Sequence, residues 1–554
     1  MKRKKIVIVG GGIAGLSAGI YGQRAGFDTV IYERNTVAGG SCSGWYRQGY
    51  AIDNCLHWLT GTRPGTSAYQ LWNELGVLDE NTELFRRACF WSSELDGKIV
   101  TLWPDAERTR AEMLELSPED ATEINAFIDL VKLGAEVVEN GIKPKELAHT
   151  ISTHESVMSD RKFFRYSMRY FGMNNISWSQ RFKSPLLRAL ILDFCPKEYE
   201  SYWMILAYSM YVSGNADVIR GGSIRMAQIM TDNYLVAGGT LELGKTVSQV
   251  FIDRRKHSII EEVQGSIHEG FAEGVTFAAT KNVAQEVASE VRDDIREKFV
   301  KRSSGIIMED GTKIEADYVI CACDINYTFR HLLSRKYVPV TLKRIYDDKK
   351  TYPLYSACQV AFAVDGLFEE IPDSLSFSCK PVEAAHEVFD RIGVKNYRAY
   401  GDYIAPEGRT VIQVSLNQYQ KDFRYWKKLY ENDREAYNRA KQNIAVAIEN
   451  AICERFPQYE GRLTLLDVWT PYSYARRNND TQGAFMRYIT TALSMNAFIS
   501  EEISGLDNVF LAGHWLIYPG GVPTAALTGK LAIGRIVARE GKSGDRLAED
   551  KSKA

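Results

Sequence analysis

The first 35 residues change their hydrophobic pattern in a way that predicts a strand, a helix and a second strand. The stretch KKIVIVGGGIAGLSAGIYGQRAGFDTVIYERN begins with Ile and Val residues, passes three glycines and ends in a second apolar run. Short apolar runs are typical of strands buried in a parallel sheet, and the glycines between strand and helix form a tight turn. This unit predicts an α/β fold that opens with a doubly wound, Rossmann-like domain.

Two stretches in the middle of the chain, GGTLELGKTVSQVFID and GIIMEDGTKIEADYVICACD, alternate apolar and polar positions and predict further strands, with a DG turn inside the second. The residues between them, 254–304, are predicted to be an insertion whose apolar positions from Val283 to Phe299 recur at helical spacing. Near the C-terminus, LDNVFLAGHWLIYPGGVPTAALTGKLAIGRIVARE predicts a strand, a Gly/Pro turn and a helix.

The other stretches predict a second domain of α+β type. Residues 68–220 have helical patterns with many aromatic residues, most of which we expect to pack in a core. The strands YSACQVAFAVD and YIAPEGRTVIQVSL precede a long charged helical run, 421–456. The first domain is predicted to be assembled from separated segments, 1–67, 221–333 and 481–540, with the second domain interleaved as 68–220 and 334–480 and a disordered tail at 541–554.

Composition restricts the classes of function. A chain of 554 residues, 45% hydrophobic and 25% charged, has the balance of a globular protein with two or more domains. Its net charge of -2 gives no electrostatic reason to expect nucleic acid as a partner. The N-terminal MKRKK lacks the apolar core of a secretory signal, and no apolar run approaches the roughly 20 residues that cross a bilayer. We expect a cytoplasmic protein, with membrane contact limited to its surface.

The glycines of the first turn have the spacing of a dinucleotide-binding loop. Gly10, Gly12 and Gly15 form G-x-G-x-x-G between strand and helix. The first permits the tight turn, the second lets the backbone approach a pyrophosphate, and the third lets the helix pack on the strand. The helix then begins with Ile13 and Ala14, whose N–H groups and the positive end of the helix dipole favour phosphate.

An acidic residue ends the second predicted strand. Glu33 lies about 20 residues after the turn, where its carboxylate can accept both hydroxyls of a ribose and would repel a 2′-phosphate. We assign its neighbour Arg34 to the same site. NAD and FAD both fit this motif, but the second glycine pair, Gly39 and Gly40, is not needed after such a strand in a nicotinamide enzyme.

Several separated segments together resemble one family. VIVGGGIAGLSAG, YERNTVAGGSCSGWYRQGYAIDNCLHWLTG, IRGGSIRMAQIM and VFLAGHWLIYPGGVPTAALTGKLA are similar to segments of the phytoene desaturase, carotenoid isomerase and retinol saturase group of the FAD-dependent amine-oxidase-like superfamily. TPYSYARRNNDTQGAF resembles a substrate-domain segment of the same group. The resemblance implies FAD as the cofactor and a substrate domain that forms a long apolar tunnel toward the flavin.

The resemblance also implies which residues contact FAD. They are Gly39, Gly40 and Ser41 beside the phosphates and ribityl chain, Val247 at the adenine, Gly513 and His514 near the pyrophosphate or ribityl chain, and Gly521, Val522 and Thr524 at the edge of the isoalloxazine. Two of these positions depart from the common pattern. Ser41 stands where many desaturases and amine oxidases have Arg, and His514 where much of the superfamily has Asp.

The segment GYAIDNCLH contributes the one candidate for a catalytic side chain. His57 matches a family position that approaches the flavin, and retinol saturase-like sequences carry His there, so we expect it to line the active site and to be a possible proton donor. A structural, hydrogen-bonded histidine is the alternative. Cys42 and Cys55 have neither C-x-x-C nor zinc-finger spacing, and we expect free buried thiols and no metal.

Three functions remain open on the sequence. The leading hypothesis is an FAD-dependent oxidoreductase that saturates, isomerises or desaturates carbon–carbon double bonds of a carotenoid, retinoid, unsaturated fatty acid or other long-chain lipid. Flavin supplies the redox chemistry, and the lack of a second G-x-G-x-x-G implies an external electron donor or acceptor. The alternatives are a flavin amine oxidase and a non-catalytic lipid-binding escort protein of the same fold.

Overall fold

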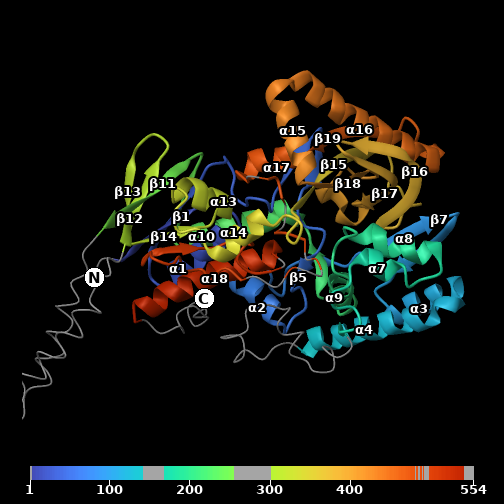
Figure 1. The fold of residues 1–554 in the computed structure, drawn as a ribbon, viewed down its shortest axis with the longest axis horizontal. Helices are drawn as coiled ribbons and strands as arrows, with labels where there is room; N and C mark the ends of the chain where they lie inside the picture. Colours follow the sequence, from blue (N-terminus) through green and yellow to red (C-terminus); the bar gives the residue numbers. More distant parts are fainter. Residues whose placement is uncertain are drawn as a thin grey trace, which may run out of the picture.

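The computed structural model describes residues 3–140, 167–254 and 301–541, except 481, 485–486, 490, 492–493, 495–497 and 519. The core of the predicted insertion and nearly all of the predicted tail lie outside the described residues. Figure 1 shows two sheet-containing regions at opposite ends of the molecule, with the N-terminal strands in one and the long helices α15 and α16 in the other.

The first region is built on a five-stranded parallel sheet with strand order β10-β2-β1-β14-β20. Its strands come from distant parts of the chain: β1 (Lys5–Val9), β2 (Asp28–Glu33), β10 (Thr240–Leu243), β14 (Tyr318–Cys321) and β20 (Val509–Leu511). This confirms the predicted doubly wound α/β fold. The strand order reverses beside β1, which creates a crevice at the carboxyl ends of β1 and β14.

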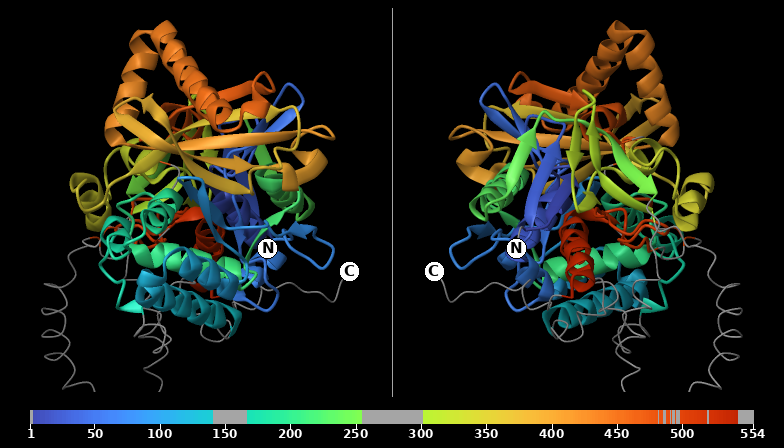
Figure 2. Two further views of the ribbon diagram at one scale, coloured as in Figure 1. Left: turned by 90° about the vertical axis from the view of Figure 1, so that its right-hand side faces the viewer. Right: turned by 90° about the vertical axis from the view of Figure 1, so that its left-hand side faces the viewer.

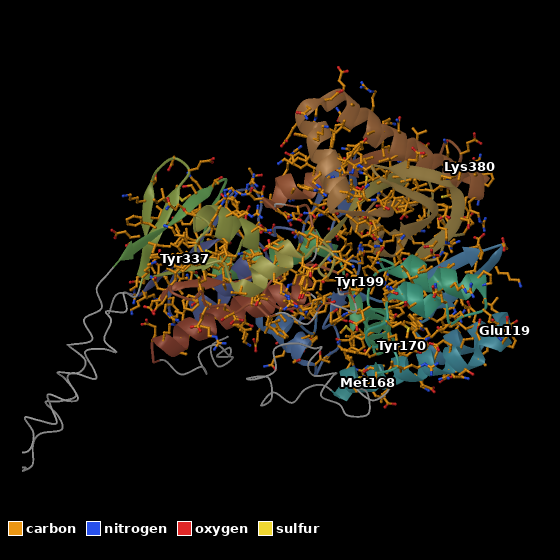
Figure 3. The ribbon with its side chains drawn as sticks, viewed as in Figure 1. Glu119, Met168, Tyr170, Tyr199, Tyr337 and Lys380 are labelled. Atoms are coloured by element: carbon orange, nitrogen blue, oxygen red, sulfur yellow. The ribbon has the colours of Figure 1, made fainter. Side chains whose placement is uncertain are left out.

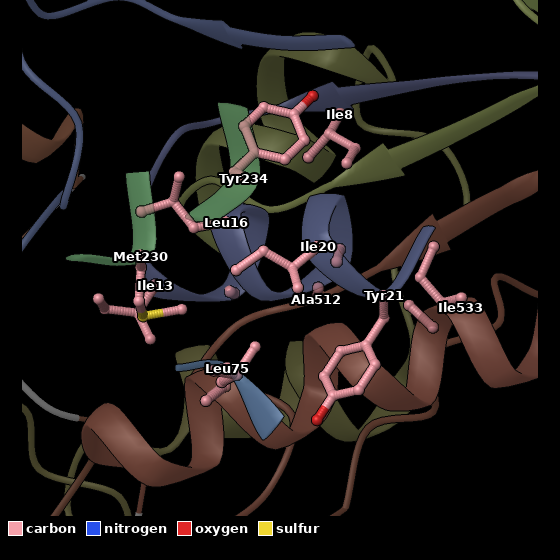
Figure 4. Packing of buried hydrophobic residues seen from close by; sticks show 14 of the residues in the cluster. Ile8, Ile13, Leu16, Ile20, Tyr21, Leu75, Met230, Tyr234, Ala512 and Ile533 are labelled. Carbon is pink, nitrogen blue, oxygen red and sulfur yellow. The ribbon is translucent and has the colours of Figure 1, made fainter. Parts of the chain in front are cut away.

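Alternation along the strands gives the sheet two buried faces. Ile6 and Ile8 pack in a cluster with α1 (Ile13–Arg24), α10 (Gly222–Val236) and α18 (Gly521–Arg539), which Figure 4 shows from close by. Val7 and Val9 point to the opposite face. That face is covered by a three-stranded antiparallel sheet of β11 (Val247–Arg254), β12 (Lys301–Met308) and β13 (Lys313–Glu315). It is also covered by three elements that follow β14: α13 (Ile325–Tyr327), the π-helical turn η2 (Thr328–Leu332) and α14 (Val340–Asp347).

The second region contains a seven-stranded sheet with strand order β19-β15-β18-β17-β16-β7-β8. Its strands are β7 (Trp91–Leu95), β8 (Lys98–Leu102), β15 (Tyr355–Val364), β16 (Ser374–Ala384), β17 (Glu387–Asn396), β18 (Thr410–Tyr419) and β19 (Leu463–Trp469). The predicted charged helical run is two helices, α15 (Gln420–Asn432) and α16 (Arg434–Arg455), because Asp433 leaves helical geometry and caps the second. Figure 2 shows this pair projecting together beyond the sheet.

One face of the seven-stranded sheet packs under α16, and the other faces the N-terminal region. Val360 and Phe362 of β15 belong to the cluster with α16, whereas Ala361 and Ala363 pack against β4 (Tyr50–Asp53). Small elements complete this junction: β3 (Gly44–Arg47), β5 (Leu59–Thr60), α2 (Ser67–Glu74), β6 (Leu84–Phe85), β9 (Ala216–Ile219), α17 (Pro471–Asn478) and the 3-10 turn η3 (Arg398–Tyr403). The 3-10 turn η4 (Pro457–Tyr459) packs in the cluster with α16.

Aromatic-rich helices form the remaining core. They are α3 (Ala106–Leu116), η1 (Pro118–Asp120), α4 (Ala121–Asn140), α7 (Asn175–Ser179), α8 (Pro185–Phe194) and α9 (Ser201–Val212). Trp178, Phe182, Tyr208 and Tyr211 are buried among them, as expected for core residues. Tyr170 lies in this layer and Tyr199 toward the centre of the molecule in Figure 3. In the described part of the chain, no helix is long and apolar enough to span a bilayer.

Candidate functional site

The glycine turn after β1 has a geometry that only glycine permits at two positions. Gly10 has φ +108°, and a Cβ there would lie 3.0 Å from the carbonyl oxygen of Ala322. A Cβ on Gly15 would lie 2.0 Å from the carbonyl oxygen of Gly10. The turn therefore brings the start of α1 close to the carboxyl ends of β1 and β14, at the crevice where open α/β sheets bind ligands.

The start of α1 is an anion-binding end. Gly12 is its N-cap residue and no side chain caps it, so the first N–H groups, including those of Ile13 and Ala14, face the crevice with the positive end of the helix dipole. The second glycine pair lies against this turn: the Gly39 N–H donates to the Gly11 carbonyl at 2.8 Å. A Cβ on Gly40 would lie 3.1 Å from Gly12 Cα.

Glu33 is held directly above the turn. Its side chain is only 5% exposed, and its Oε2 accepts from the Gly11 N–H at 2.8 Å. Its Oε1 accepts from the backbone N–H of Asn35 at 2.7 Å and from the Asn35 side-chain amide at 2.8 Å. Oε1 therefore already accepts two donors, whereas Oε2 keeps capacity for one more, which suits a ribose hydroxyl.

We expect Glu33→Ala to weaken FAD binding by about tenfold, because one hydrogen bond to a charged group is lost. Titration of FAD-free protein with FAD, followed by quenching of flavin fluorescence, measures the change. Glu315→Ala is the matched control, since Glu315 is an exposed acid on β13. Equal affinities of the Glu33 variant and the unchanged protein would rule out the assigned role.

The end of α17 also reaches this site, which the sequence reasoning did not foresee. The Asn478 amide donates to Ser41 Oγ at 3.0 Å, and the Asn35 amide donates to the Arg477 carbonyl at 3.2 Å. Arg477 Nε and Asn478 Oδ1 are buried without a hydrogen-bond partner. The sequence predicts this segment to belong to the substrate domain, and its polar run RRNN is the signal that indicates a polar ligand.

The C-terminal segment lies at the same crevice. Gly513 has φ +148° and open space where its Cβ would be, and its N–H donates to Thr528 Oγ1 at 2.9 Å. Burial and the charge of Arg487 lower the pKa of His514 to about 4, so its imidazole is neutral at pH 7. Gly521 and Val522 begin α18, and Thr524 donates to the Gly520 carbonyl at 2.9 Å. Val247 begins β11, and its carbonyl accepts from Tyr327 at 3.1 Å.

Arg487 is a buried cation that the sequence reasoning missed. Its side chain is fully buried, its guanidinium carbon lies 4.9 Å from the ring centroid of Tyr488, and none of its three nitrogens has a hydrogen-bond partner among the described residues. Its backbone lies beside the start of α18, because a Cβ on Gly520 would be 3.5 Å from Arg487 N. Desolvation lowers the pKa of this guanidinium. An uncompensated charge of this kind is costly unless a ligand meets it.

His57 lies in a loop before β5, with its ring 6.5 Å from that of Trp58. Its Nδ1 is buried without a partner. Burial, followed by the charges of Lys395 and Arg87, lowers the pKa of His57 well below its usual value. The neutral imidazole therefore dominates at pH 7, so a proton donated by His57 would come from a neutral ring N–H.

Cys42 and Cys55 are both free cysteines. Cys42 is buried, and a hydrogen bond with Cys55 together with burial raises the pKa of its thiol well above the usual value. The thiols are therefore neighbours, a contact that their sequence spacing did not predict. Among the described residues, no group of three or more His, Cys, Asp or Glu side chains is arranged to hold a metal ion.

The residues of the crevice fit FAD. The turn leaves no room for side chains at Gly10 and Gly15, the start of α1 favours a pyrophosphate, and Glu33 can accept a ribose hydroxyl. Buried polar atoms of α17 and of Arg487 have no hydrogen-bond partner among the described residues. Together these features define a dinucleotide-binding flavoprotein.

Family models agree with this class. Residues 8–75 match the NAD(P)-binding Rossmann-like domain, and residues 264–537 match the flavin containing amine oxidoreductase family. The protein is an FAD-dependent oxidoreductase and belongs to the FAD-dependent amine-oxidase-like superfamily.

Alignments with individual relatives cover almost the whole chain. It is 21% identical to 4,4'-diaponeurosporene oxygenase of Staphylococcus haemolyticus, over 98% of this chain and 99% of the relative. It is 19% identical to the enzyme of the same name from Staphylococcus aureus strain MW2, with the same coverage.

Solved structures share the fold. An oxidoreductase from Methanosarcina mazei aligns with a TM-score of 0.57 at 14% identity, over 96% of this chain and 100% of the other. A variant of putrescine oxidase aligns with a TM-score of 0.56 at 14% identity, over 97% of this chain and 99% of the other. At these identities the likeness concerns the fold alone.

Proposed function

We propose that the protein uses FAD to transform carbon–carbon double bonds of a long polyene lipid of carotenoid type, by saturation, isomerisation or desaturation. The observation that carries this proposal is the likeness to two enzymes named 4,4'-diaponeurosporene oxygenase along 98% of the chain. When bound, the flavin supplies hydride and single-electron transfer. The protein residues bind the cofactor, orient the apolar chain and exclude water.

The aromatic side chains near His57 support an apolar substrate. Trp58 packs on Phe90 and Phe194 with ring centroids 5.3 and 6.4 Å apart, and Phe90 lies 5.1 Å from Tyr211. This wall lies beside the segment proposed to approach the flavin. Its rings can hold a polyene through apolar contacts.

A lipid substrate also favours contact with a membrane surface and requires an external electron donor or acceptor. Met168 and Phe171 are 50% and 59% exposed, although both side chains are apolar. Met168 lies at the lower edge of the molecule in Figure 3. We propose this edge as the place where the protein meets a membrane surface.

Anaerobic mixing with candidate substrates tests the proposed function. The purified protein is expected to bind FAD and to change its flavin absorbance with a carotenoid, in the oxidised state if it desaturates or in the reduced state if it saturates. Benzylamine and putrescine serve as the comparison. Reduction of the flavin by an amine, with no response to any polyene, would favour an amine oxidase; a flavin that no chemical donor can reduce would favour the escort protein.

A further inference from the structure

Three basic side chains converge beside the aromatic wall. His57 precedes β5, Arg87 lies between β6 and β7, and Lys395 is on β17. Val394 points toward α16, so strand alternation places Lys395 on the opposite face of the sheet. There its register partner Gln413 donates at 3.1 Å to the carbonyl of Asp53, the last residue of β4, which leads into the loop that contains His57.

Arg87 lies within the aromatic wall. Its guanidinium carbon is 5.7 Å from the ring centroids of both Trp58 and Phe90 and 6.0 Å from that of Tyr211. The residue is 8% exposed, and its Nε and Nη2 are buried with no hydrogen-bond partner in the part of the chain that the structure describes. Contact with ring faces offsets part of the lost hydration but leaves the N–H donors unused.

No acid neutralises this cluster among the residues that the structure describes: no carboxylate oxygen lies within 4.0 Å of Arg87 or Lys395. Two acids lie in the neighbourhood, and both are engaged elsewhere. Asp373 accepts from the Ala88 N–H and lies 4.0 Å from Arg398. Asp53 accepts from the N–H of Ser223 at 2.7 Å and from those of Cys55 and Leu56 at 3.0 and 3.2 Å.

The electrostatic consequence is mutual repulsion. Burial, and then the charge of Arg87, lower the pKa of Lys395 to about 7. The same two cations add to the effect of burial on His57. A cluster of like charges in an apolar wall is unfavourable by itself, and an anion placed between the cations would offset this cost.

We propose that Arg87, Lys395 and His57 form a binding site for the carboxylate end of a long apolar substrate. The proposal rests on the proposed function and adds that the lipid ends in a carboxylate. The planar guanidinium suits the two oxygens of a carboxylate, Lys395 adds a second cation, and the neutral His57 ring can donate one hydrogen bond. The adjoining aromatic rings accept the apolar part of the same ligand.

Paired probes test the site in the FAD-loaded protein. All-trans-retinoic acid is compared with methyl retinoate, and linoleic acid with methyl linoleate, by equilibrium dialysis at pH 6.5. At least one acid is expected to bind about tenfold or more tightly than its ester, because the ester has no charge to pair with the cations. The two pairs distinguish a polyene acid from a fatty acid as the ligand.

The variants Arg87→Met and Lys395→Met are each expected to reduce the preference for the acid toward equal binding. Methionine keeps an apolar side chain of similar length. Lys380→Met is the matched control: Lys380 is on the neighbouring strand β16, its side chain is 80% exposed, and it lies at the outer edge of the molecule in Figure 3. Flavin absorbance and the melting temperature report whether each variant is folded.

Equal binding of acid and ester by the unchanged protein, or failure of all four probes to bind, would overturn the inference whether or not the variants fold. A preference that survives both substitutions would overturn it as well. Failure of the proposed function would give a different result from failure of this inference. No polyene would be converted, but the protein would still bind the acid more tightly than the ester. If only the inference fails, an uncharged carotenoid would still be converted without any preference for acids.

Discussion

Gly12→Val is expected to lower the affinity for FAD by about 100-fold or more, because the valine side chain would fill the space in front of the first N–H groups of α1. The loss should be specific to the cofactor. A Cβ at Gly12 would meet only Gly40 Cα at 3.8 Å and the Gly39 carbonyl oxygen at 4.0 Å, so the backbone need not move. The FAD content of the purified protein and titration of the FAD-free form measure the effect.

Gly12→Ala is the graded control for this prediction. It adds only the Cβ, at ordinary contact distance, and is expected to keep more of the affinity than the valine variant. The melting temperature of the FAD-free protein should be similar for both variants. A valine variant that is purified with a full complement of FAD would show that the pyrophosphate does not pass in front of Gly12.

Arg487→Met is expected to lower the midpoint potential of the bound flavin by about 30 mV or more, which equals about 1.4 kcal/mol for a two-electron couple. Arg487 lies beside Gly520, directly before the helix that we propose to meet the isoalloxazine. Reduction adds negative charge to the flavin, and a buried cation nearby favours that form. Equilibration with a reference dye under anaerobic conditions measures the potential.

The charge of Arg487, rather than its packing, is the tested quantity. Arg487→Lys keeps a cation, so its bound flavin is expected to have a midpoint potential close to that of the unchanged protein. The methionine variant is expected to have a lower one. The FAD-free methionine variant should also unfold at a higher temperature, because a buried guanidinium without partners is removed. An unchanged potential in the methionine variant would place Arg487 away from the redox-active ring.

The strands and the glycine turn were predictable because their signals are local. The apolar runs around Gly10 and Gly15 fix a buried parallel strand and a helix packed close to it, and the DG turn at Asp310 and Gly311 joins β12 and β13. The fold class, the superfamily and FAD as the cofactor were predicted from sequence and are confirmed. The contacts of individual residues with FAD, and the domain boundaries, stay predictions.

The cations of the site were not predictable, because nothing in a linear pattern distinguishes a lysine or arginine that other elements cover from an exposed one. Lys395 stands in the strand EVFDRIGVKN, where it shares one face with Glu387 and Arg391, and charged residues of this kind are typical of an exposed face. That face instead meets the loop around Asp53, which is distant in sequence. The same reason explains the contact between Cys42 and Cys55 and the approach of α17 to Ser41.

The mass of the product formed in a single turnover tests the central claim most directly. The FAD-loaded protein is mixed anaerobically with 4,4'-diaponeurosporene, once with the flavin oxidised and once with the flavin reduced. The lipid is then extracted and its mass is measured by mass spectrometry. We expect a product that differs by two hydrogens, or an isomer of unchanged mass with a shifted absorbance spectrum. Recovery of unchanged lipid in both states, while an amine reduces the flavin, would contradict it.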